Sequence, residues 1–137
     1  MVLVGADAYL ARKGVPESPV ALSRHDCIID TNYRDPGHWR FFVGGAIVSI
    51  PVRGRLHYSN AEACLQAAAA GLGLAYVPDF VAAEALREGR VREVLPDVVD
   101  EPFGAYVLYP PGRHLAGKVR ALVDFLAAHF RGRDVSL

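Results

Sequence analysis

The sequence has little cysteine, no excess of charge of either sign and no long apolar run. Its two cysteines, Cys27 and Cys64, lie far apart and outside any C-x-x-C spacing, so we expect both to be buried thiols. Fifteen basic residues balance fifteen acidic ones, which argues against direct binding to a phosphate backbone. The apolar stretches, such as Ala67–Pro78, contain glycines and stop well short of the ~20 residues of a membrane helix. We expect neither a membrane span nor direct DNA binding.

Catalytic and metal-binding patterns are also missing. No G-x-S-x-G turn is present to expose a nucleophile, and the five histidines include no i,i+4 pair with a cysteine or acid at ligand spacing. The first residues lack the basic segment of a signal peptide, which favours the cytoplasm. The sequence therefore predicts a protein that is not an enzyme and that holds no metal or cofactor.

Helical and strand patterns alternate along the 137 residues, which is typical of an α/β fold with one core. Alternating side chains over residues 39–50 flank Gly44 and Gly45, a pair that predicts a β-hairpin with a tight turn. Leu74–Val77 is a short apolar run stopped by a proline, as expected of a buried strand.

Two helices carry most of the functional interest. Ser59-Asn60-Ala61-Glu62 fits a capping box, in which the Ser59 hydroxyl would accept from the Glu62 amide. Near the end of the chain, apolar residues recur at helical spacing and predict an amphipathic helix; they are Leu115, Val119, Leu122, Val123, Leu126 and Phe130.

Several short motifs occur in the order found in one family of regulators. Asp7–Pro16 resembles "S-x-Y-L-x-x-x-G-x-P", and residues 19–28 resemble "P-x-x-L-x-x-H-x-C-I". Ala70–Pro78 resembles "A-G-L-G-I-A-x-L-P", the most specific of these matches. Together with weaker matches up to residue 130, these motifs resemble the effector-binding domain of LysR-type transcriptional regulators.

The resemblance implies a fold and a division of the chain. We expect a periplasmic-binding-protein-like (type II) lobe, with a mixed sheet flanked by helices, plus the C-terminal amphipathic helix. The chain would be a single partial effector-binding domain over residues 1–137. Lobe two would span about residues 6–108, while residues 1–5 and 109–131 would belong to lobe one. The family's DNA-binding domain would be absent.

The resemblance also implies a small effector, often an organic anion, bound between two lobes that crossing strands at residues 4–8 and 105–110 join. The start of the helix at Ser59 would favour a carboxylate through its free amides. The candidate effector-binding residues are Asp7, Tyr9, Thr31, Asn32, Ser59, Asn60, Pro78, Tyr109 and Arg113.

Each candidate also has a structural interpretation. Ser59 and Asn60 would then only cap their helix, Asp7 would cap another, Tyr9 would lie in the core, and Arg113 would point into solvent.

Two functions remain open at this point. The first is an effector-sensing module that also oligomerises, with a dimer as the expected assembly. The second is a truncated self-associating module that binds neither effector nor DNA. In both, the apolar residues Leu115, Val119, Leu122, Val123 and Leu126 would form the oligomer interface.

Overall fold

The computed structural model describes residues 1–98 and 117–130, and the chain divides into two compact units, Met1–Pro102 and Phe103–Leu137. The first unit contains β1 (Val2–Gly5), α1 (Asp7–Lys13), η1 (Pro19–Arg24), β2 (Cys27–Asp30), β3 (His38–Val43), β4 (Ala46–Pro51), β5 (His57–Tyr58), α2 (Ala61–Ala69), β6 (Leu74–Val77), α3 (Asp79–Arg87), β7 (Arg92–Glu93) and η2 (Pro96–Val98). The second contains α4 (Gly117–Phe130). Within these residues, no helix has the length and apolar content required to cross a membrane.

A five-stranded mixed sheet, in the order β5-β2-β6-β1-β7, organises the first unit. Strand β2 runs parallel to both β5 and β6, whereas β1 runs antiparallel to β6 and β7. The mixed sheet with flanking helices confirms the predicted α/β fold. We expected residues 1–5 to belong to another lobe, but Val2–Gly5 pair residue for residue with β6 inside this sheet.

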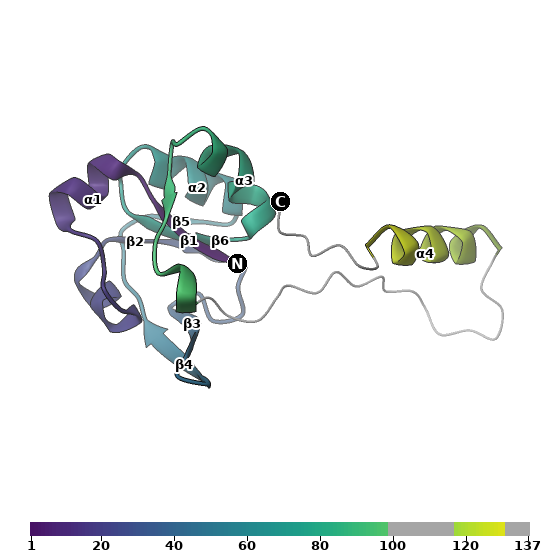
Figure 1. Cartoon of the computed structure of the whole chain (residues 1–137), viewed down its shortest axis with the longest axis horizontal. Coiled ribbons are helices and arrows are strands. Elements are labelled where there is room, and N and C mark those ends of the chain that lie inside the picture. The colour runs from purple at the N-terminus through teal and green to yellow at the C-terminus, as the bar shows by residue number, and fades with distance from the viewer. Residues whose placement is uncertain (99–116, 131–137) are drawn as a thin grey trace. The chain divides into compact units, whose positions relative to one another are not determined.

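The two faces of the sheet bury different partners because neighbouring strand residues point to opposite sides. Leu3 lies in a cluster with residues from the hairpin and from η1, whereas Val4 lies in a cluster with residues from α2 and α3. Figure 1 shows the same arrangement, with α2 and α3 on one side of the sheet and the β3–β4 hairpin on the other. The expectation of buried thiols is confirmed, because Cys27 and Cys64 are both free and buried, one in each cluster.

The hairpin forms where the alternating pattern predicted it. Gly44 and Gly45 connect β3 to β4 with φ angles of 59° and 86°, which side chains other than glycine rarely adopt. Trp39 and Phe41 point inward and are buried, and both rings lie beside Tyr76 of β6. The hairpin therefore covers one face of the sheet.

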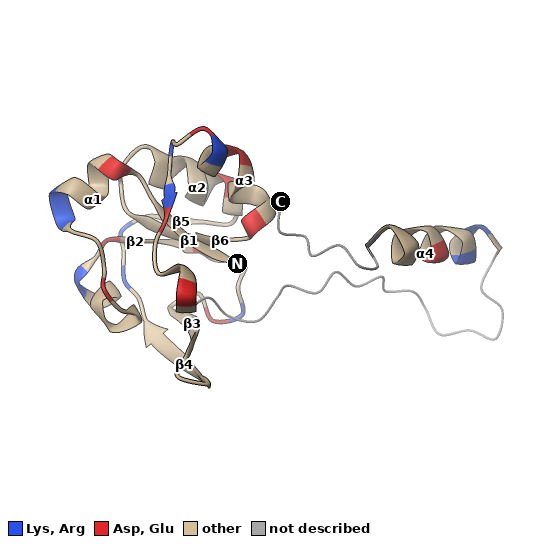
Figure 2. Ribbon diagram, viewed as in Figure 1, with Lys and Arg blue, Asp and Glu red and all other residues tan. Residues whose placement is uncertain are grey.

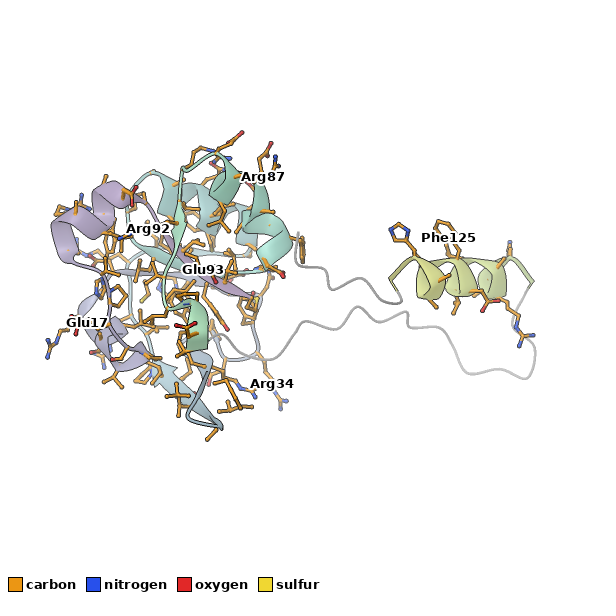
Figure 3. All side chains as sticks on the ribbon, in the orientation of Figure 1. Glu17, Arg34, Arg87, Arg92, Glu93 and Phe125 are labelled. Atoms are coloured by element: carbon orange, nitrogen blue, oxygen red, sulfur yellow. The ribbon has the colours of Figure 1, made fainter. Side chains whose placement is uncertain are left out.

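Helix α4, in the second unit, confirms the predicted amphipathic helix. Val119, Val123 and Leu126 are partly buried, whereas Leu122 and Phe125 are 55% and 63% exposed. Phe125 projects from the helix (Figure 3), and its ring stacks on His129 with the centroids 5.9 Å apart.

Candidate functional site

The carboxyl ends of β2, β5 and β6 lie at one edge of the sheet, because these three strands run parallel. The chain leaves them after Asp30, Tyr58 and Val77, and each strand is followed by polar or turn-forming residues. The structure thereby brings together five of the predicted site residues, which are Thr31, Asn32, Ser59, Asn60 and Pro78. Ligands of open α/β folds commonly bind outside such an edge, at the ends of the strands. We call it the carboxyl edge.

The start of α2 is one part of the carboxyl edge. Asn60 caps this helix, and its side-chain oxygen accepts from the backbone N–H groups of Glu62, at 2.8 Å, and Ala63, at 3.3 Å. The predicted Ser59 cap is therefore wrong. Ser59 and Asn60 are both good capping residues, and only the backbone shows that Asn60 occupies the position from which an oxygen reaches these amides.

The loop after β2 is attached to the end of β5. The backbone N–H of Thr31 donates to the carbonyl oxygen of Tyr58 at 2.8 Å, and its hydroxyl donates to the same oxygen at 3.2 Å. The side-chain nitrogen of Asn32 donates to the carbonyl oxygen of Ser59. Both predicted site residues are exposed, so they combine a fixed position with contact to solvent.

Asp30 is a residue of this edge that is absent from the predicted site residues, because the turn-forming residues after it favour an exposed loop. Its side chain is 5% exposed, and one carboxylate oxygen accepts from the backbone N–H of Asn32 at 2.9 Å. The sequence contained one indication of this burial. Asp30 directly follows the apolar run Cys27-Ile28-Ile29, and the last residue of a buried strand still lies within the core.

Tyr33 completes the loop at this edge. Its hydroxyl donates to the sulfur of Met1 at 3.4 Å, which connects the loop to the beginning of the chain. Burial raises the pKa of the Tyr33 phenol above its usual value of 10.0, and the negative charge of Asp30 raises it further. Tyr33 is therefore a neutral hydrogen-bonding group at ordinary pH.

Asp7 and Tyr9 lie away from the carboxyl edge, which corrects the expectation that they belong with the other candidates. Because β1 is antiparallel, its final residue pairs with Leu74, the first residue of β6, and α1 begins at the opposite edge of the sheet. Tyr9 is fully buried, accepts from the backbone N–H of Asp26 at 2.8 Å and hydrogen-bonds to Nδ1 of His25 at 3.2 Å.

Asp7 is exposed and forms an ion pair with Arg92 at 3.1 Å. It is the first residue of α1 rather than its cap, which is Ala6. Neither Asp7 nor Tyr9 is placed to share a ligand with Asn32 or Asn60.

Three predicted residues fall outside the described part of the chain: Tyr109, Arg113 and Leu115. The same holds for the second crossing strand, expected at residues 105–110. Pro78 is described; it is partly buried and precedes the first residue of α3.

Residues suited to metal binding or nucleophilic chemistry are sparse in residues 1–98 and 117–130. No group of three or more His, Cys, Asp and Glu side chains gathers there in a way that could hold a metal ion. Burial raises the pKa of Cys27 to about 12 and that of Cys64 to about 11, so neither thiol is ionised near neutral pH. Figure 2 shows acidic and basic residues interspersed along the ribbon of the first unit.

Comparison with protein families gives a match over almost the whole chain. The model described as "LysR substrate binding domain" matches residues 1–131. Among curated relatives, the transcriptional activator TtdR of Escherichia coli is 32% identical over 129 residues, which cover 93% of this chain and 41% of the relative. The regulator PtxR of Pseudomonas aeruginosa is 32% identical over 135 residues, covering 97% of this chain and 42% of PtxR. The chain therefore spans less than half the length of these relatives.

Comparison with solved structures also gives matches over most of the chain. The full-length structure of the Vibrio cholerae virulence activator AphB matches with a TM-score of 0.79 and 29% identity, over 93% of this chain and 44% of AphB. The regulatory domain of AphB from Vibrio vulnificus matches with a TM-score of 0.73 and 26% identity, over 93% of this chain and 63% of that domain.

Proposed function

This chain belongs to the LysR substrate-binding domain family, and we propose that it is the effector-sensing module of a LysR-type transcriptional regulator. Its curated relatives are regulators rather than enzymes. The chain itself would not contact DNA. The complete regulator would act in the cytoplasm, where it would combine the sensing of a small molecule with binding to a promoter.

We propose that the effector is a small organic acid bound at the carboxyl edge, in a cleft between this lobe and a second one. The observation that carries this proposal is the convergence of the ends of β2, β5 and β6 with the start of α2 at one edge. The positive end of the α2 dipole favours a carboxylate, while the amides of Glu62 and Ala63 already donate to the Asn60 cap. Asn32, Thr31 and Asn60 supply polar atoms beside it.

Effector binding at such an edge would act on transcription by favouring one relative arrangement of the two lobes, and with it one geometry of the attached oligomer. The test is isothermal titration of the complete regulator with a panel of small aromatic and aliphatic acids, combined with promoter occupancy. We expect one acid to bind and to change occupancy. No binding and no effect on occupancy by any member of the panel would contradict the proposal.

The second candidate function is self-association through α4, and the exposure of Leu122 supports it. The proposed interface comprises Leu115, Val119, Leu122, Val123 and Leu126. Burial of one such side chain contributes about 1.5–3 kcal/mol, so a symmetric pair of these helices could hold a dimer together.

A further inference from the structure

Helix α1 is held against the sheet by contacts of its own side chains. A helix of seven residues has little stability by itself in water, so its position depends on these contacts. The hydroxyl oxygen of buried Tyr9 accepts from the backbone N–H of Asp26 at 2.8 Å, and Lys13 forms an ion pair with Asp26 at 3.3 Å. Arg12 donates to the carbonyl oxygen of Gly71 at 2.9 Å.

His25 lies between α1 and the start of β2. It is partly buried, its Nδ1 lies 3.2 Å from the Tyr9 hydroxyl oxygen, and the two rings have their centroids 5.9 Å apart. Positive charge surrounds these rings, because Lys13 acts on His25 and Arg12 lies 5.7 Å from the centroid of the Tyr9 ring. Asp26 is the negative group that acts on His25, and Lys13 already pairs with it. A further positive charge on His25 is therefore poorly compensated.

Protonation of His25 would act against this arrangement in two ways. It would add a positive charge beside Lys13, in a partly buried position where burial also disfavours the charged ring. The charged ring also carries a hydrogen on both nitrogens, so neither nitrogen can accept the hydrogen of the Tyr9 hydroxyl. Neighbours in the chain do not offset these effects, since Arg24 is positive and burial raises the pKa of the Cys27 thiol to about 12.

We propose that His25 is a pH-sensitive latch for α1: the neutral ring holds the helix on β2, and protonation in mild acid releases it. Release of α1 exposes Tyr9 and Leu10, which are both buried when the helix is docked. The docked state lowers the pKa of His25, so it binds a proton less well than the released state, in which the ring has its ordinary pKa of 6.5. Docking is therefore strongest above pH 6.5 and weakens as the pH falls through the lowered value. The latch needs no effector and does not depend on the proposed function.

The experiment is amide hydrogen exchange of the full chain at about pH 7.5 and about pH 5.5, with each protection factor corrected for the intrinsic exchange rate. In the wild type, protection of the Asp26 amide and of residues 10–14 should fall about threefold more than protection of α3. In His25→Gln, which keeps a polar side chain without the charge, this additional loss should vanish. His57→Gln is the matched control, because His57 is an exposed residue of β5, and it should respond as the wild type does.

A second measurement uses the wild type alone and covers the case in which His25→Gln does not fold. The midpoint of the change in α1 protection should coincide with the titration of the His25 ring, followed through its imidazole resonances. Equal protection of α1 at both pH values would overturn the latch, as would a wild-type response in His25→Gln or a midpoint away from that of His25. A loss for α1 no greater than the loss for α3 would also overturn it, because the pH would then act on the whole fold.

Discussion

The side-chain nitrogen of Asn32 donates a hydrogen bond to the backbone carbonyl oxygen of Ser59, across 27 positions of the sequence. This bond attaches the loop after β2 to the residue that precedes the Asn60 cap of α2. Two segments of the candidate site therefore hold each other in place without a ligand.

Asn32→Ala should loosen this attachment. The substitution removes one exposed hydrogen bond, so the free energy of unfolding should fall by about 0.5–1.5 kcal/mol. Amide hydrogen exchange of residues 31–33 should accelerate by a larger factor than exchange in β6. Unchanged protection of this loop would show that the bond does not restrain it. Thr31→Ala is a matched control, because the backbone N–H of residue 31 would still donate to the carbonyl oxygen of Tyr58.

Asn60→Ala should destabilise the protein more than Ser59→Ala. Loss of the cap removes the partner of two backbone N–H groups and should cost about 1 kcal/mol, whereas exposed Ser59 makes no cap bond. Urea unfolding of the two variants measures the difference directly. A larger loss of unfolding free energy for Ser59→Ala would instead support the capping box that the sequence predicts.

Gly54→Ala should strongly destabilise the fold, because a Cβ at this position would lie 1.6 Å from the carbonyl oxygen of Cys27. The backbone of β2 would have to move, which places the substitution among the most destabilising, at several kcal/mol. Gly117→Ala is the control, since a Cβ there meets nothing within 4 Å among the described atoms. Thermal unfolding should show a large loss for the first variant and little change for the second.

Stability should fall as the pH is lowered through the range below about 6.5. Burial, followed by the charge of Lys13, lowers the pKa of His25 below its ordinary value of 6.5, so the unfolded chain binds more protons than the folded chain in this window. The contribution of His25 is fully present above pH 6.5 and is lost as the pH falls through the lowered folded-state pKa.

Tyr9 and Asp26 surround His25 in the folded chain. The Tyr9 hydroxyl accepts from the Asp26 N–H and lies 3.2 Å from Nδ1 of His25, with which it forms a hydrogen bond. The negative charge of Asp26 opposes the lowering of the His25 pKa. Urea titrations at several pH values, with His25→Gln for comparison, should show a weaker dependence in the variant; an identical slope would exclude His25 as the source.

If the chain self-associates through α4, a charged substitution on the apolar face of that helix should weaken the association. Leu122→Glu should shift the particle towards the monomer in light scattering, because it places a charge within the apolar face. Ala121→Glu, one residue away on the opposite face, should leave the mass unchanged. A wild type that stays monomeric at high concentration would contradict self-association altogether.

Local patterns predicted much of the fold. The diglycine identified the hairpin because residues at positive φ are almost restricted to glycine, and the period of the apolar residues identified α4. The position of Asp7 and Tyr9 could not be predicted from local patterns, since it depends on the direction of β1 within the sheet. The burial of Asp30 could not be predicted from local patterns either, because the turn-forming residues after it favour an exposed loop.

The central claim, that a small acid binds at the carboxyl edge, is tested most directly by mapping the amide resonances of the isotope-labelled full chain during titration with a panel of carboxylates. We expect at least one acid to shift the resonances of Thr31, Asn32, Asn60 and Ala61 together while those of Asp7 and Tyr9 stay in place. Shifts confined to the Asp7 and Tyr9 edge, or no shifts with any acid, would contradict the claim.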